Sequence, residues 1–244
     1  MYPTISLNKL NTMTNIFITG NSSGLGLGLS RYYLQQGSQV YGLSRSDSPV
    51  QHPNLHQSTQ DLAQLDQIDA CLQKLLPDSL DLVILNAGIL GKINDLADTS
   101  LQETRTIMDV NVWANKVIID WLIRHQIRVR QLIIISSGAS INGNRGWGVY
   151  SISKASVNMM AQLYAHEMPD THITAYAPGL VQTSMQDYLC KEVDTSKFTS
   201  IGFLVKAYNT EAMPDIDTAA AQIAGSFERC LTLKSGSFAD IRQL

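Results

Sequence analysis

The chain has 244 residues, of which 44% are hydrophobic, and a formal net charge of −3 at pH 7. This size and composition allow a sizeable core in one α/β domain. The absence of a Lys/Arg run argues against binding to nucleic acid or an acidic membrane. The three cysteines, Cys71, Cys190 and Cys230, are widely spaced, which fits neither a disulfide framework nor a zinc site and favours a reducing compartment.

No apolar run reaches about 18 residues, and the start of the chain lacks the basic-then-apolar layout of a signal peptide. We therefore expect a soluble, cytoplasmic protein without a membrane span or a metal site. Residues 1–14 are predicted to form a flexible N-terminal extension, because Met1–Thr12 is polar and without periodicity. An added strand, or an arm on a neighbouring subunit, is the alternative. Residues 15–244 are predicted to form one domain.

Residues 16–30 are predicted to form a strand, a glycine-rich turn and the start of a helix over about 25–36. Gly20 can adopt a φ that a side chain would forbid, Gly24 lets the backbone approach a pyrophosphate, and Gly26 lets the helix pack closely on the strand. The helix N-terminus then offers N–H groups to an anion. The spacing Thr-Gly-x-x-x-Gly-x-Gly resembles the cofactor motif of the short-chain dehydrogenase/reductase family. The residues expected to bind the cofactor here are Thr19, Gly20, Ser22, Ser23, Gly24, Leu25 and Gly26.

The end of the second predicted strand, over residues 39–43, should meet the adenosine ribose. An acid at this point would accept from the 2′-hydroxyl, whereas Arg would attract a 2′-phosphate. Ser44 stands where NAD-dependent members of the family have their acid, and Arg45 follows it. This resembles the NADP-preferring pattern, so NADP is the expected cofactor and NAD the less favoured one. The alternative is that Arg45 is simply solvated.

A weak third strand is predicted over 55–58. The Asp61-Leu62 pair after it resembles the family's step beside the adenine. Asp61 could instead be the N-cap of the helix predicted over 65–76, and both roles can hold at once. The apolar run 81–85 is typical of a buried parallel strand. It leads into Asn86, Ala87 and Gly88, which match the family's Asn-Ala-Gly motif.

A long helix is predicted over about 101–124, with Asn111 on an otherwise apolar stretch. A buried Asn is costly unless it is hydrogen-bonded. In the family this Asn holds a water that joins the active-site Lys to solvent. A fifth strand over 132–135 then feeds Ser136 and Ser137.

Tyr150 and Lys154 are four residues apart, so on a helix they share one face. A lysine ammonium near a phenol favours the phenolate and lowers the Tyr pKa from about 10 toward the range useful for general acid–base catalysis. Ser137 precedes Tyr150 by the family's usual interval and is therefore the predicted carbonyl-polarising hydroxyl, with Ser136 as the alternative.

These motifs occur together in the order found in the family, so the chain is identified as a member of the short-chain dehydrogenase/reductase family, most strongly over residues 15–183. Membership implies an α/β Rossmann-type, doubly wound sheet of about seven mostly parallel strands with helices on both faces. A sixth strand is predicted over 173–177, a helix over 218–231 and a short last strand over 235–239. Residues 184–217 occupy the place of the substrate lid. After the sixth strand, the motif that resembles the family's nicotinamide- and phosphate-binding segment contains Pro178, Gly179, Val181 and Thr183.

The function predicted from the resemblance is the interconversion of an alcohol and a ketone or aldehyde by NADP-dependent hydride transfer. Tyr150 would exchange the proton, Lys154 would also hold the nicotinamide ribose, Ser137 would bind the substrate oxygen and Asn111 would support the proton relay. The alternative is a dinucleotide-binding redox sensor or scaffold without turnover. The partner is a small molecule, and the family implies a homodimer or homotetramer. Apolar residues that could form an oligomer surface, or could equally be core, are Trp113, Ile118, Trp121, Met159 and Met160.

Overall fold

The computed structural model describes residues 14–244, and the predicted extension over 1–12 lies outside the described residues. The strands are β1 (Asn15–Thr19), β2 (Gln39–Ser44), β3 (Leu55–Thr59), β4 (Ser79–Leu85), β5 (Arg128–Ile135), β6 (His172–Ala177) and β7 (Ser237–Asp240). The α-helices are α1 (Gly24–Gln35), α2 (Ile68–Leu75), α3 (Leu101–Met108), α4 (Ala114–Arg124), α5 (Gly148–Glu167), α6 (Ser184–Lys191), α7 (Ile201–Ala207) and α8 (Ile216–Cys230).

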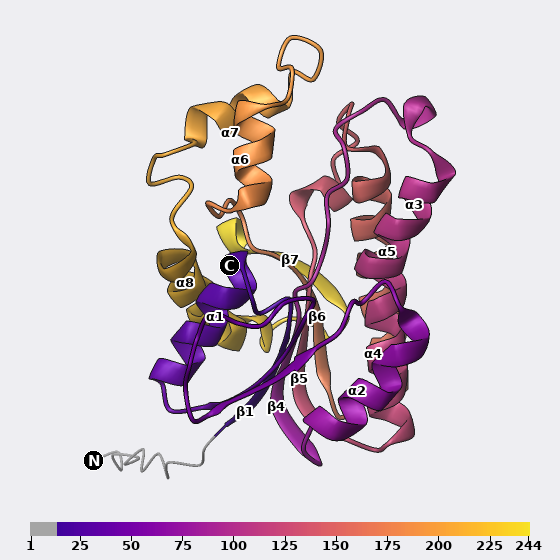
Figure 1. Ribbon diagram of the computed structural model, residues 1–244, viewed down its shortest axis with the longest axis vertical. Coiled ribbons are helices and arrows are strands. Elements are labelled where there is room, and N and C mark those ends of the chain that lie inside the picture. Colours follow the sequence, from indigo (N-terminus) through magenta and orange to yellow (C-terminus); the bar gives the residue numbers. More distant parts are fainter. Residues whose placement is uncertain (1–13) are drawn as a thin grey trace, which may run out of the picture.

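The seven strands form one sheet in the order β3-β2-β1-β4-β5-β6-β7, and every neighbouring pair is parallel. Helices α1 and α8 cover one face, while α2, α4 and α5 cover the other (Figure 1). The order reverses direction between β1 and β4, which is the point where doubly wound sheets bind ligands beyond the carboxyl ends of their strands. The predicted fold class is confirmed, and the sheet is parallel throughout.

The long helix predicted over 101–124 is interrupted. Helix α3 ends at Met108, residues Asp109–Trp113 form a π-helical segment, and α4 starts at Ala114. Single π-helical turns within α-helices are common at functional sites. Here the widened turn contains Asn111, whose backbone carbonyl accepts from Asn115 Nδ2 at 2.8 Å. Periodicity predicted the helix but not this insertion, because the apolar spacing survives a single widened turn.

The helix predicted over 65–76 is shorter than expected. It starts as a 3₁₀ turn over Leu65–Gln67, and the α-helix proper runs over Ile68–Leu75. Leu76 is extended, as a residue before a proline is expected to be.

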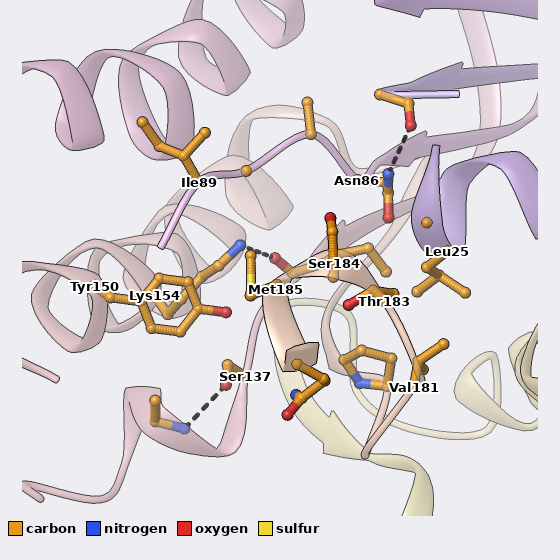
Figure 2. Close-up of a pocket in the computed structure, with 18 of the residues that line it drawn as sticks. Leu25, Asn86, Ile89, Ser137, Tyr150, Lys154, Val181, Thr183, Ser184 and Met185 are labelled. Atoms are coloured by element: carbon orange, nitrogen blue, oxygen red, sulfur yellow. Dashed lines mark hydrogen bonds between the residues drawn. The ribbon is translucent and has the colours of Figure 1, made fainter. Parts of the chain in front are cut away.

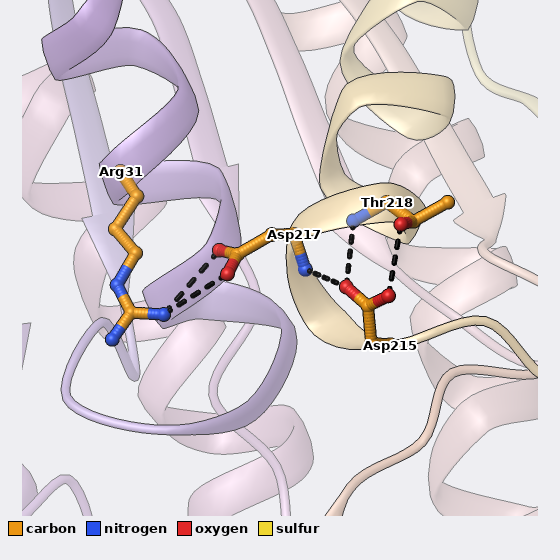
Figure 3. A network of polar contacts seen from close by, with 4 residues as sticks. All are labelled: Arg31, Asp215, Asp217 and Thr218. Atoms are coloured by element: carbon orange, nitrogen blue, oxygen red, sulfur yellow. Dashed lines mark hydrogen bonds and ion pairs between the residues drawn. The ribbon is translucent and has the colours of Figure 1, made fainter.

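The last helix begins two residues earlier than predicted because Asp215 caps it. Asp215 Oδ1 accepts from the backbone N–H groups of Asp217 and Thr218, each at 2.9 Å, and Oδ2 accepts from the Thr218 hydroxyl (Figure 3). Asp217 in turn pairs with Arg31 of α1 at 3.2 Å. An exposed pair of this kind contributes little stability, so the packing of α1 against α8 rests on closer contacts.

One such contact is at Gly28 of α1, where a Cβ atom would lie 2.3 Å from the backbone oxygen of Ile216. Gly28→Ala should therefore force the two helices apart and lower the free energy of unfolding by about 1 to 3 kcal/mol. Gly225 of α8 is the matched control, because a Cβ there meets nothing within 4 Å. Gly225→Ala should leave stability equal or raise it by up to about 1 kcal/mol. Urea denaturation measures both changes, and equal effects would contradict the packing argument.

Helices α6 and α7 pack on each other and on the loop after β4 around a third apolar cluster, which includes Leu90, Ile93, Phe198 and Ile201. Ile93 donates its backbone N–H to the hydroxyl of Tyr188 on α6 at 3.1 Å. These two helices stand above the carboxyl ends of the strands (Figure 1). Residues 184–217 thus lie where a substrate lid was predicted.

Candidate active site

A cleft of about 700 Å³ opens at the carboxyl ends of the strands, beneath α6 and α7. Figure 2 shows part of its wall, with Ser137, Tyr150 and Lys154 opposite the segment that carries Thr183, Ser184 and Met185. The predicted cofactor-binding residues that line it are Gly20, Ser22, Ser23, Gly24, Leu25, Ser44, Arg45, Asp61, Leu62, Asn86, Ala87, Gly88, Tyr150, Lys154, Pro178, Gly179, Val181 and Thr183. The tertiary structure brings together residues that lie more than 160 positions apart in the chain.

The glycine turn has the conformation that the sequence predicted. Gly20 and Gly24 have positive φ values of +69° and +52°, which side chains rarely adopt. A Cβ on Gly26 would lie 2.2 Å from the Gly20 carbonyl oxygen, so only glycine lets α1 pack this closely under the turn. Ser23, the N-cap of α1, makes no side-chain capping bond within residues 14–244. The N-terminal N–H groups of the helix face the cleft wall and can donate to a phosphate.

Thr19 and Gly26 lie beneath the cleft and not on its wall. The Thr19 hydroxyl accepts from the backbone N–H groups of Asn86 and Ala87 at 2.9 and 3.1 Å, and the Asn86 amide donates to the Thr19 carbonyl at 3.0 Å. These bonds join the ends of β1 and β4 across the point where the strand order reverses. Thr19 therefore positions the Asn-Ala-Gly segment and is itself fully buried.

A closed polar network lies at the adenosine end of the cleft. Ser44 Oγ donates to Asn21 Oδ1 at 3.0 Å, Asn21 Nδ2 donates to Gln57 Oε1 at 2.6 Å, and Gln57 Nε2 donates to Ser44 Oγ at 3.1 Å. Gly42 leaves the room for it, since a Cβ there would lie 2.1 Å from Asn21 Nδ2. Ser44 is thus held by protein groups, whereas Arg45 is exposed and forms no ion pair within the described part of the chain.

Asp61 does not cap the helix that follows it, so that alternative was wrong. Its Oδ1 accepts from the backbone N–H of Ala63 at 3.0 Å and closes a local turn, while the first helical turn begins only at Leu65. The three intervening residues place the carboxylate out of reach of the helix N–H groups. Asp61 lines the cleft. Its predicted contact with the adenine stays a prediction.

The two candidate serines have different surroundings. Ser136 is buried and donates to Asn158 Oδ1 at 2.6 Å. Ser137 is partly exposed, its Oγ accepts from the backbone N–H of Ala139 at 3.1 Å, and it lies below the Tyr150 ring in the close-up (Figure 2). Its hydroxyl interacts with the Tyr150 side chain. The geometry therefore favours Ser137 over Ser136.

Tyr150 and Lys154 are on α5, with Lys154 Nζ 5.8 Å from the centroid of the Tyr150 ring. Burial raises the pKa of the Tyr150 phenol, and interaction with the Ser137 hydroxyl opposes this rise. Lys154 was predicted from the sequence to lower this pKa, whereas the net shift is upward. The Lys154 ammonium donates to the Ile135 carbonyl at 2.7 Å. Tyr150 is therefore protonated at neutral pH, which is the form that a proton donor to a carbonyl needs.

Burial lowers the pKa of Lys154 to about 8. Its ammonium is charged below this value and neutral above it. Because kcat/KM reports ionisations of the free enzyme, kcat/KM for NADPH should be constant near pH 7 and fall as the pH rises through about 8, at most about tenfold per pH unit. Steady-state kinetics between about pH 7 and 10 measure the profile. Lys154→Arg, which stays charged, is the control and should remove this break; a break that persists in the variant would assign it to another group.

Asn111 is fully buried, and its amide is satisfied by neighbours. Its Oδ1 accepts from the Ile89 N–H at 2.8 Å, and its Nδ2 donates to the Ile89 carbonyl at 2.9 Å and to Ser153 Oγ at 3.0 Å. Asn111 does not line the cleft. Its hydrogen bonds connect the loop after β4 to Ser153 of α5, the residue before Lys154. The Asn111 side chain therefore positions residues of the site without lining the cleft.

The sequence argument missed several residues that line the cleft. Ser46 and Asp47 follow Arg45 at the adenosine end, and their adjacency to the end of β2 was the available signal. At the other end, further wall residues include Ile89, Asn142, Asn144, Trp147 and Arg242. These residues belong to no motif, so only the fold could place them.

The fold and the cleft define a dinucleotide-dependent oxidoreductase: a glycine turn at a helix N-terminus lies at one end, and a Ser, Tyr and Lys group lies at the other. The model of the short chain dehydrogenase family matches residues 14–194, and the chain belongs to this family of NAD(P)-dependent dehydrogenases and reductases. Among residues 14–244, no helix is both long and apolar enough to span a membrane.

Two relatives are similar to this chain in sequence, and a solved structure is similar to it in fold. An uncharacterized oxidoreductase of Schizosaccharomyces pombe is 33% identical over 181 residues, which cover 70% of this chain and 72% of the relative. A benzil reductase ((S)-benzoin forming) of Bacillus subtilis is 30% identical over 184 residues, covering 69% and 75%. The crystal structure of a short chain dehydrogenase/reductase from Saccharomyces cerevisiae superposes with a TM-score of 0.80 at 21% identity, covering 93% of this chain and 96% of that one.

Proposed function

We propose that the protein is an NADP-dependent oxidoreductase that interconverts an alcohol and a ketone or aldehyde. The observation that carries this proposal is that Ser137, Tyr150 and Lys154 line the same cleft as the glycine turn and Arg45. The residues present fit a dinucleotide. The glycine turn would hold the pyrophosphate, Arg45 a 2′-phosphate, and Val181 and Thr183 the nicotinamide end.

When bound, the reduced cofactor supplies the hydride that is added to the carbonyl carbon, and it leaves oxidised. The Ser137 hydroxyl donates to the substrate oxygen and polarises the carbonyl. Tyr150, which burial keeps protonated, gives its proton to that oxygen as the C–H bond forms, so the carbonyl gains one hydride and one proton. Lys154 binds the nicotinamide ribose and offsets the charge left on the phenolate.

The substrate end of the cleft favours an apolar, bulky carbonyl compound. Its wall includes Trp147, Leu180, Met185 and Phe203, and the Trp147 and Tyr150 ring centroids are 6.1 Å apart. Such a wall suits an aryl group attached to the reacting carbon. Because a relative of 30% identity is a benzil reductase, benzil is the first substrate to test.

NADPH oxidation, followed at about 340 nm against a panel of ketones, aldehydes and quinones with benzil included, tests the proposal. We expect turnover of aryl ketones and little of small aliphatic ones. Tight NADPH binding without turnover of any member of the panel would instead support a redox sensor or scaffold. Residues 184–217 act as the lid in this proposal. Shortening this segment should therefore change KM for the substrate more than KM for NADPH.

We further propose a homodimer or homotetramer assembled through α4 and α5. Of the five apolar residues named from the sequence, Ile118, Trp121 and Met160 are core, whereas Trp113 and Met159 are exposed. Ile152 and Leu163 of α5 add to the exposed group. Exposed apolar side chains on α5 and on the π-helical segment before α4 are typical of an interface between subunits. Size-exclusion chromatography with light scattering tests this, since a monomer would contradict it.

A further inference from the structure

Arg242 lies at the substrate end of the cleft. Along the chain, it is far from every motif found in the sequence. It belongs to the 3₁₀ turn Ile241–Gln243 that follows β7, and its side chain lines the cleft. Its Nη2 atom lies 3.4 Å from the position that a Cβ on Gly138 would occupy. Gly138 directly follows Ser137, the residue assigned to the substrate oxygen. The guanidinium therefore lies beside the loop that carries Ser137, whereas the glycine turn and Arg45 are the groups assigned to the phosphates.

The guanidinium is fixed by a buried carboxylate. Asp240 Oδ1 accepts from Arg242 Nε at 2.8 Å and from its backbone N–H at 3.0 Å, and Oδ2 accepts from Nη2 at 2.5 Å. Asp240 is 4% exposed, whereas the Arg242 side chain is 59% exposed. Its hydrogen bonds to Asp240 raise the pKa of Arg242, so the group is charged throughout the working pH range. A two-point contact to a rigid carboxylate orients the planar fork and uses two of its five N–H donors.

The remaining N–H donors can bind an oxygen acceptor next to the reacting carbonyl. A substrate whose second oxygen is on the carbon adjacent to the reacting one would place that oxygen within a few Å of Ser137 and hence beside Arg242. On the basis of the proposed function, we propose that Arg242 determines specificity by binding the second oxygen of a 1,2-dicarbonyl substrate, with the apolar wall of the cleft holding its aryl groups.

Two kinds of second oxygen share this chemistry: the carbonyl of a 1,2-diketone and the carboxylate of a 2-oxo acid. The structure favours the diketone. The Asp240 carboxylate next to the guanidinium repels a second anion, whereas a neutral carbonyl accepts a hydrogen bond from Arg242 without that repulsion. The apolar wall of the cleft, which suits an aryl group, also favours the diketone.

The test compares benzil with deoxybenzoin, which has the same two rings but lacks the second carbonyl, and with benzoylformate, in which a carboxylate replaces the second benzoyl group. Benzil is intrinsically more electrophilic, so the quantity compared between proteins is the ratio of kcat/KM for benzil to kcat/KM for deoxybenzoin. In Arg242→Met we expect this ratio to fall about ten- to a hundredfold, the value of a hydrogen bond to a charged group. Arg130→Met is the matched control. Arg130 also pairs with a carboxylate, that of Glu228, but lies outside the cleft, so its ratio should stay within about twofold of wild type.

Direct binding provides a second readout. Titration calorimetry with Tyr150→Phe and NADPH measures the Kd of both compounds without turnover, and Arg242→Met in that background should weaken benzil about tenfold more than deoxybenzoin. Arg242→Gln, which keeps a donor for Asp240, guards against a folding defect and should show the same loss of selectivity.

If Arg242→Met lowers kcat/KM for benzil and for deoxybenzoin equally, or lowers neither, the ratio is unchanged. Arg242 would then have no role in selecting the second oxygen, and the proposal would be overturned. If Arg242→Met lowers kcat/KM for benzoylformate more than kcat/KM for benzil, Arg242 binds a carboxylate. That result would overturn the choice of a diketone. If wild type turns over none of the three, the proposed function fails for these substrates, while the calorimetric selectivity still decides whether Arg242 binds the second oxygen.

Discussion

Tyr150→Phe should lower turnover at least about a hundredfold, the lower end of what a general acid contributes. The substitution removes one hydroxyl and keeps the ring that packs near Trp147, so the shape of the cleft is preserved. The Kd for NADPH, measured by fluorescence titration, should stay close to wild type. Because the phenol of Tyr150 is the proposed proton donor, the loss should appear in kcat.

Three further variants make this result specific. Ser137→Ala should also lower kcat strongly, because it removes the donor to the substrate oxygen, whereas Ser136→Ala should act mainly on stability through its bond to Asn158. Lys154→Ala should harm both kcat and NADPH affinity, since one side chain serves both. Unchanged turnover in Tyr150→Phe would contradict the proposed mechanism and show that another group supplies the proton.

Wild type should prefer NADPH over NADH by roughly ten- to a hundredfold in kcat/KM, which is the value of a charge-assisted contact between a guanidinium and a phosphate. Arg45 is at the adenosine end of the cleft and is exposed, so it can turn toward a 2′-phosphate without breaking an ion pair within residues 14–244. Arg45→Gln should remove most of the preference by raising KM for NADPH and leaving KM for NADH nearly unchanged. Arg31→Gln on α1 is the control.

Reversing the preference requires an acid as well. Ser44→Asp combined with Arg45→Gln should favour NADH, because the carboxylate accepts from a free 2′-hydroxyl and repels the phosphate. The network around Ser44 can accommodate the change, since Asn21 and Gln57 each carry an amide that can turn its N–H₂ group toward a carboxylate. Equal kinetic constants for NADPH and NADH in wild type would show that Arg45 is only solvated.

The sequence by itself determined the family, the sheet class and the residues on the cleft wall that carry motifs. These are local features. The glycine turn needs positive φ at Gly20 and Gly24, a buried parallel strand needs an apolar run such as 81–85, and Tyr150 and Lys154 meet because they are one helical turn apart. Each requirement is satisfied within a few residues, so spacing alone reveals it.

Only the tertiary structure decided which groups surround those residues. It shows that Ser136 is buried and bonded to Asn158 while Ser137 is partly exposed, that Asp61 closes a turn and caps no helix, and that Lys154 donates to Ile135. It also brings Arg242 beside Gly138, more than 100 positions away in the chain. The physical reason is that burial, the direction of a pKa shift and the alignment of a hydrogen bond depend on neighbours supplied by distant segments, and no local pattern encodes which segments those are.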